Sequence, residues 1–277
     1  MGKSFVRILN LIFYISLVVC GVCRIILKLK YIDHGSGFYA GGGVLVILFN
    51  AVLLVAVLLL FCMTRLRKAS GDYRVRQNNR FGAAICLLSG SSVIAFTVSE
   101  LPDTLASYEG VNLLGLISGY GSSILGFGAG IALLVMGTMS FLGKEQDVNP
   151  LLLLCPSLWQ LLLLISKFNS YATITTISDH MLTVMFMLFN TLFLFGHART
   201  VCGLGRNDGR NYSIPAGFCS ALFGLLLVVP NYIYMLASRS IVPPVSTLSL
   251  LQSAYILLLS VYAVSFVHSV TRSIRVV

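Results

Sequence analysis

Charged residues are scarce in this chain. They make up 10% of its 277 residues, against roughly 25% in a soluble globular domain. Acidic residues are the scarcer sign, with 9 Asp and Glu against 19 Lys and Arg. A domain folded in water needs charge to cover its surface, so this composition, together with a mean hydropathy of +0.91, excludes an ordinary soluble fold.

Several functional patterns are also missing. The longest polar links, Thr64–Arg80 and Gly196–Ser213, are too short to bury a core of their own. No zinc-type spacing of Cys and His and no nucleophile–base pattern occurs. We therefore expect no enzyme activity, no cofactor and no metal site, and any ATPase or sensor activity would need a partner subunit. Nucleic acid is not an expected partner, because no folded basic module accompanies the positive links.

Long apolar runs fill most of the chain instead. A helix needs roughly 20 apolar residues to cross the hydrocarbon core of a bilayer, and these runs lack the alternation of barrel strands. The sequence predicts an all-α fold: a polytopic transmembrane bundle of about eight helices, forming a single integral membrane domain over 1–277. The runs are Ile8–Leu27, Tyr39–Met63, Phe81–Ser99, Leu113–Leu142, Pro150–Ser166, Thr173–Phe195, Ile214–Ala237 and Ser246–His268.

The positive charges indicate an orientation. If both termini are cytoplasmic, most Lys and Arg residues lie on the inner side, as the positive-inside rule requires. Lys28 and Lys30 oppose the rule in the first outer link. We expect a plasma membrane, with the bacterial inner membrane as the default, and the lipid bilayer as the main partner. The inner basic residues are Lys3, Arg7, Arg65, Arg67, Lys68, Arg74, Arg76, Arg80, Lys144, Arg199, Arg206, Arg210, Arg272 and Arg275.

Two further patterns concern packing. The two basic links occupy matching places in the halves 1–142 and 150–277, which permits a 4+4 helix duplication, although coincidence is the simpler explanation. Glycines recur at spacings of four and seven in the fourth run. Such a face lets neighbouring helices approach closely, whereas a sliding or pore-lining helix would use the same residues. These glycines are Gly115, Gly119, Gly126, Gly130 and Gly137.

The sixth run carries the most polar residues. Asp179, Thr183, Asn190 and His197 follow one helical face, with His180 beside the carboxylate. Ionisable residues at membrane depth are costly and usually have partners or a function. We expect Asp179 about two turns from the outer helix end, in an ion pair with Lys167. The alternative is a proton relay or a cation site.

Other polar candidates lie in three different runs. Arg24 belongs to the outer part of the first helix, and Glu100 and Asp103 are its expected counterions. Asn231 follows Pro230, which should kink the seventh helix. Pro156 similarly interrupts the fifth. Interrupted helices flank substrate sites in some transporters.

These features support more than one class of function. A small permease, or the membrane subunit of a transport system, fits the glycine face, the interrupted helices and the polar residues Arg24, Glu100, Asp179, His180, Asn190 and Asn231. The alternative is a non-transporting membrane scaffold or a sensor subunit. An intramembrane enzyme is the weakest hypothesis.

Overall fold

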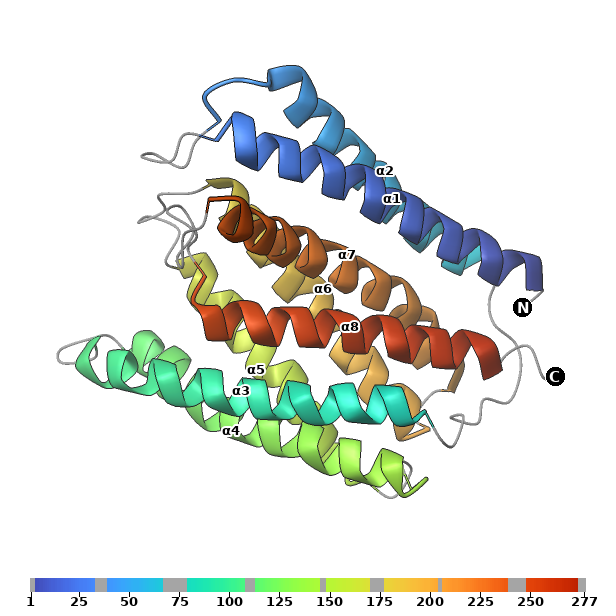
Figure 1. Cartoon of the computed structure of the whole chain (residues 1–277). Coiled ribbons are helices and arrows are strands. Elements are labelled where there is room, and N and C mark those ends of the chain that lie inside the picture. Colours follow the sequence, from blue (N-terminus) through green and yellow to red (C-terminus); the bar gives the residue numbers. More distant parts are fainter. Residues whose placement is uncertain are drawn as a thin grey trace.

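Eight helices form the structure, a computed structural model (Figure 1). It describes residues 3–32, 39–66, 79–107, 113–144, 148–169, 177–203, 206–238 and 248–273. In these ranges the helices are accompanied by no strand, only by a single bridge between Ile32 and Tyr39. The helices are α1 (Lys3–Lys30), α2 (Gly43–Leu66), α3 (Arg80–Ser107), α4 (Leu113–Phe141), α5 (Pro150–Asn169), α6 (Ile177–Val201), α7 (Arg206–Ser238) and α8 (Leu250–Ser273).

All eight helices are long and apolar enough to cross a membrane. Large apolar side chains cover the outside of the bundle, as shown by Val44, Leu54 and Leu151, which are 84%, 62% and 74% exposed. Water would penalise this surface, whereas lipid tails solvate it. The expected all-α bundle is therefore confirmed, and the chain is a multi-pass membrane protein.

The bundle has two ends. The end at which α1 begins and α8 ends is called the terminal face, and the opposite end is called the distal face (Figure 1). Because successive helices run in opposite directions, α6 begins at the distal face and α7 ends there. The α1–α2 hairpin packs mainly on α7, whereas α3 and α4 lie on the other side, against α8 and α5.

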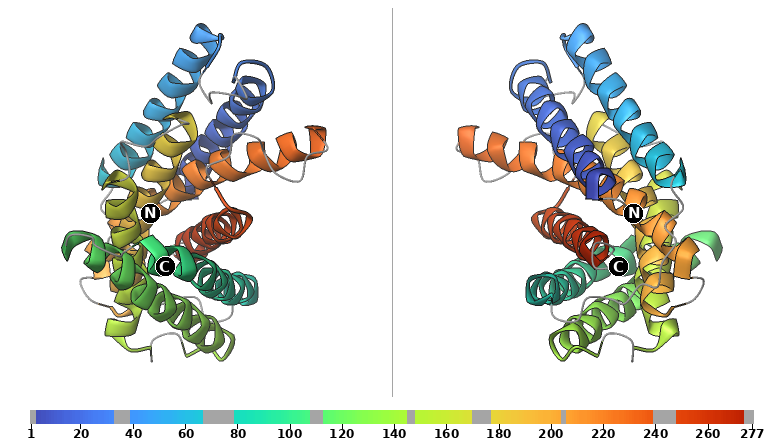
Figure 2. Two further views of the ribbon diagram at one scale, coloured as in Figure 1. Left: turned by 90° about the vertical axis from the view of Figure 1, so that its left-hand side faces the viewer. Right: turned by 90° about the vertical axis from the view of Figure 1, so that its right-hand side faces the viewer.

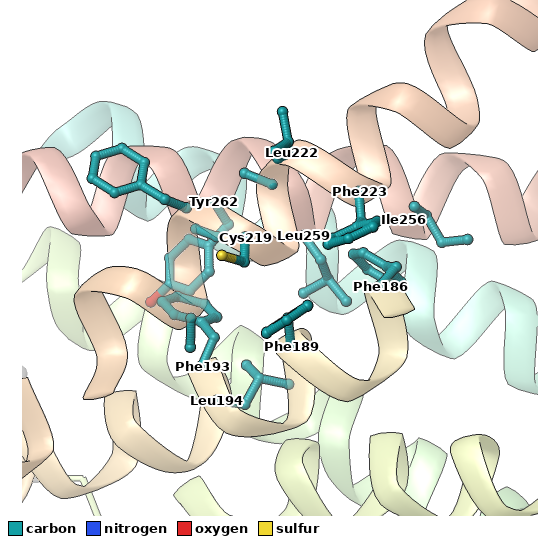
Figure 3. Close-up of a cluster of buried hydrophobic side chains, with 14 of the residues drawn as sticks. Phe186, Phe189, Phe193, Leu194, Cys219, Leu222, Phe223, Ile256, Leu259 and Tyr262 are labelled. Carbon is teal, nitrogen blue, oxygen red and sulfur yellow. The ribbon is translucent and has the colours of Figure 1, made fainter. Parts of the chain in front are cut away.

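The core is built around α7. Its most apolar stretch is 83% buried, compared with 22% for α2. Aromatic rings fill the space between α6, α7 and α8 (Figure 3). Phe189 stacks on Phe223 with ring centroids 5.4 Å apart, and Phe193 meets Phe266 edge-on at 5.8 Å. Since helices in lipid associate through close packing rather than hydrophobic exclusion, these contacts hold the centre together.

Some helix boundaries differ from the sequence-based expectations. The inner link expected at Gly196–Ser213 is largely helical, because α6 continues to Val201 and α7 already starts at Arg206. Pro156 does not interrupt α5, and Pro230 lies inside a continuous α7. In the end-on views the last turns of α7 project to the side of the bundle (Figure 2). A polar link can continue a helix where packing supports it.

The glycines of α4 face α3. A Cβ on Gly126 would meet Thr97, one on Gly130 would meet Ile94, and one on Gly137 would lie 2.8 Å from Leu87. The two backbones therefore approach as a small-residue face allows. Gly115 and Gly119 belong to α4, but their surroundings lie outside the described residues. The 4+4 duplication stays a prediction.

Candidate functional site

A cluster of charged side chains lies near the distal face, where α1, α6 and α7 meet. Arg24 and Lys28 come from the last two turns of α1, Asp179 from the first turn of α6, and Asn231 from about two turns before the end of α7. These four residues are called the distal ion cluster. All are buried, with exposures of 1%, 4%, 3% and 3% in that order.

Asp179 is shared between two cations. One carboxylate oxygen accepts a hydrogen bond from the Arg24 guanidinium and the other lies 2.9 Å from Nζ of Lys28. Arg24 and Lys28 are four residues apart, so both side chains lie on one face of α1. The carboxylate also sits at the start of α6, where the partial positive charge of the helix terminus favours an anion. The ion pairs therefore join the first helix to the sixth.

Two neutral groups accept hydrogen bonds from the cations of the cluster: Asn231, which belongs to it, and Tyr39, which lies beside it. Nζ of Lys28 also donates a hydrogen bond to Oδ1 of Asn231, and Nη1 of Arg24 donates to the Tyr39 hydroxyl, just before α2. The Nδ2 group of Asn231 is buried and has no hydrogen-bond partner among the residues that the structure describes. Pro230 precedes this residue inside α7. The cluster therefore contains several hydrogen-bond donors. Among the described residues, the Asp179 carboxylate is its charged acceptor.

Charge does not balance within this group of residues. Two cations and one carboxylate leave one positive charge among the described side chains, in a site that water barely reaches. Burial of charge is expensive, since insertion of Arg or Lys into a bilayer centre costs about 2.5–3.5 kcal/mol even on the mildest scale. The ion pairs with Asp179 offset part of this cost.

Two of the expected ion-pair partners, Lys167 for Asp179 and Glu100 for Arg24, were wrong. Asp179 pairs with Arg24 and Lys28, whereas Lys167 interacts electrostatically with His180. Glu100 is exposed near the end of α3, so it is not the buried counterion of Arg24, and the side chain of Asp103 lies outside the described residues. Asp179 is also closer to the helix start than expected, since the described part of α6 begins at Ile177. The pairing differs from the expectation because of how the helices are arranged side by side: α1 packs against α7 rather than against α3.

The two remaining candidates on α6 are also buried. His180 lies beside the cluster, whereas Asn190 lies away from it. His180 is 8% exposed in the first turn of α6. Asn190 lies about three turns further on. Its Oδ1 accepts a hydrogen bond from Ser220 at 3.2 Å, and its Nδ2 has no partner among the described side chains. The structure therefore brings together Arg24, Asp179 and Asn231, but not Asn190 or Glu100.

Sequence reasoning missed Lys28. The residue was counted among the charges of the outer link, where it opposed the positive-inside rule. Its spacing of four from Arg24 was the available signal, because two basic residues on one buried helical face need a common acceptor. Tyr39 carried no comparable signal, since its contact depends on how the link before α2 returns to α1.

A second polar group lies between α5 and α8. The Tyr255 hydroxyl faces the amides of Gln160 and Gln252. Within the described part of the chain, however, both polar atoms of Gln160, Nε2 of Gln252 and the Tyr255 hydroxyl have no hydrogen bond of normal geometry. Trp159 and Phe96 enclose the tyrosine, with ring centroids 5.5 and 4.8 Å away. Unsatisfied buried groups are uncommon and cost stability.

A third group lies toward the terminal face. The Tyr262 hydroxyl is 2.9 Å from Nε2 of the buried His197. Beside it is a cavity of about 20 Å³ whose lining includes Asn79, Ser140 and Tyr262. This volume is enough for a single water molecule but not for a solute. The group is a buried polar contact beside this small cavity.

Comparison with known proteins gives no assignment: no family model matches the chain, and neither the curated proteins nor the solved structures contain a match. The function must be argued from the site itself.

Proposed function

We propose that this multi-pass membrane protein is a transport-type protein, either a small permease or the membrane subunit of a larger transport system. The observation that carries the proposal is the distal ion cluster, in which one carboxylate serves two cations from another helix in a buried position. Ionisable groups inside membrane domains are rare and mark substrate and ion pathways, so they indicate a functional site by default.

The position of the cluster supports this function. It lies at the seam between the α1–α2 hairpin and the remaining helices. Contacts across the seam also include ring pairs, such as Phe13 with Phe218 at 4.8 Å and Phe61 with Phe189 at 5.9 Å. Transporters place their sites where two bodies rock against each other. We infer that the α1–α2 hairpin can move relative to α7 along this seam.

The shape of α7 adds a second argument. Pro230 removes one backbone hydrogen bond of the helix immediately before Asn231. A proline in a membrane helix frees a carbonyl group and gives the helix a point at which it can bend. The bend point and the polar side chain therefore coincide at the seam.

The orientation of the chain in the membrane is part of the same proposal. With the N- and C-termini in the cytoplasm of a plasma membrane, the terminal face is the inner one and the distal face the outer one. Support comes from the Lys and Arg bias of the sequence. The cluster would then be reached from the outside, and a bacterial inner membrane is the simplest setting.

Flux measurements test the proposal. The purified full chain would be reconstituted in liposomes, and charge movement and internal pH would be recorded as a panel of solutes is added outside. We expect a solute-dependent signal that is lost in Asn231→Leu and kept in Lys30→Gln, which changes an exposed charge at the same end of α1. A folded protein without a signal for any solute or for protons would contradict a permease that works alone. If a specific partner chain then co-purifies and the reconstituted complex also gives no signal, transport is contradicted and the scaffold alternative is supported.

A further inference from the structure

We propose that the cavity lined by Asn79, Ser140 and Tyr262, called the terminal cavity, is a hydration site. It takes one water molecule, which links the buried Tyr262–His197 pair to the solution at the terminal face. The inference goes beyond the proposed function, because it concerns the end of the bundle opposite to the distal ion cluster and does not depend on transport.

The terminal cavity lies where three helices reach the terminal face. α3 begins there, and α4 and α8 end there. Asn79, just before α3, and Ser269, in the last turns of α8, are half-buried lining residues, whereas Ala83 and Tyr262 are buried ones. Tyr262 precedes Ser269 by two turns of helix, or about 10 Å. The cavity thus extends from partly exposed polar groups near the helix ends toward Tyr262 inside the bundle.

The size and the lining of the cavity fit one water molecule. Its volume is about 20 Å³, whereas a water molecule needs roughly 10–15 Å³ of cavity space and two to four polar partners. Cavities that stay dry are apolar. Here the lining includes four side chains with a hydroxyl or amide group, which are Asn79, Ser140, Tyr262 and Ser269.

Asn79 is held in place beside the cavity by both neighbouring helices. Its Oδ1 accepts a hydrogen bond from the backbone N–H of Gly82, which caps the start of α3. Its Nδ2 donates one hydrogen to the Ser265 hydroxyl of α8 at 3.1 Å. An amide group has two N–H donors, so a second hydrogen is available to a water molecule. Glycine is needed at position 82, because a Cβ there would lie 2.6 Å from Nδ2 of Asn79.

The buried end of the cavity carries the polar pair. The Tyr262 hydroxyl is 2.9 Å from Nε2 of His197 and 3.7 Å from Sδ of Met136, which also lines the cavity. A hydroxyl group can take part in up to three hydrogen bonds, so the contact with His197 leaves room for a water molecule. His197 is 3% exposed and packs against the rings of Phe193 and Phe266. One water therefore gives a buried imidazole a hydrogen-bonded connection to the terminal face.

X-ray radiolysis tests the site on the full chain purified in detergent. Hydroxyl radicals form from water during the exposure, and a side chain beside a bound water is oxidised even where bulk solvent does not reach it. Mass spectrometry measures the conversion of Met136 to its sulfoxide and the hydroxylation of Tyr262. Met187 is the internal control, because it is buried to a similar degree in the apolar core. We expect Met136 and Tyr262 to be oxidised faster than Met187.

Two neighbouring alanines of α3 provide matched variants. Ala83 lines the cavity, whereas Ala84 is half-buried and points to a different side of the helix. The added methyl groups of Ala83→Val should displace the water, so that oxidation of Met136 falls to the level of Met187. Ala84→Val should leave it unchanged. If Ala83→Val does not fold, Ser269→Leu replaces it and fills the cavity from α8.

Three results would overturn the proposal. They are oxidation of Met136 no faster than that of Met187 in the wild type, unchanged oxidation in the folded cavity-filling variant, and an equal fall in Ala84→Val. None of these measurements uses flux, so the hydration site and the transport function are tested separately.

Discussion

Gly90 of α3 and Gly130 of α4 bring their backbones into direct contact: a Cβ on Gly90 would lie 2.8 Å from the carbonyl oxygen of Gly130. Real Cβ atoms do not approach a backbone so closely. The contact lies at the middle of both helices, so any separation there propagates along the pair.

Gly90→Ala should therefore destabilise the protein. The added methyl group forces the two helices apart, and overpacking of this kind costs about 1–3 kcal/mol. Thermal unfolding in detergent measures the effect. Gly128→Ala is the matched control in α4, because its Cβ would meet Cys155 at an ordinary 3.7 Å. Equal melting temperatures for the two variants would contradict the close approach.

Asp179→Asn should destabilise the protein more strongly, by about 3–5 kcal/mol, because it leaves two buried cations without their carboxylate. Adding Lys28→Met should recover part of the loss, since one of the two unmatched charges is then removed. A double-mutant cycle in chemical or thermal unfolding measures this coupling. Glu100→Gln is the control, as the same change at an exposed carboxylate should alter stability by less than about 0.5 kcal/mol.

Two tyrosines of α8 should respond differently to loss of the hydroxyl group. Tyr262→Phe removes the hydrogen bond to His197 and should lower stability by about 1–3 kcal/mol. Tyr255→Phe removes a buried hydroxyl without a hydrogen bond of normal geometry, so stability should stay equal or rise. Comparison of the two melting temperatures checks the assignment. A lower melting temperature for Tyr255→Phe than for Tyr262→Phe would refute it.

Thiol labelling should reveal the orientation. Lys30 and Lys144 are both exposed and lie at opposite faces of the bundle. With the terminal face inside, a membrane-impermeant maleimide added to intact cells should label Lys30→Cys but not Lys144→Cys, with the parent chain as the background. Labelling of Lys144→Cys alone would reverse the proposed orientation.

The sequence was sufficient to predict the membrane-spanning segments, but not to predict which charged residues pair with each other. Each apolar run had the length that a bilayer demands, and each became a helix. Asp179 was singled out as an unusual residue, and Arg24 and Asn231 with it; all three are buried in the structure. Their mutual contact was not foreseen, because Arg24 and Asp179 are 155 positions apart and nothing local relates α1 to α6.

What the sequence determined by itself is a property of each segment taken alone: its length, its apolar character and the charge at its ends. These suffice because the hydrocarbon thickness of a membrane acts on every helix separately. Only the tertiary structure decided which helices are neighbours, and so which residue serves as the counterion of Asp179. Lateral order among helices that are equally apolar depends on close packing between specific side chains, which no single segment contains.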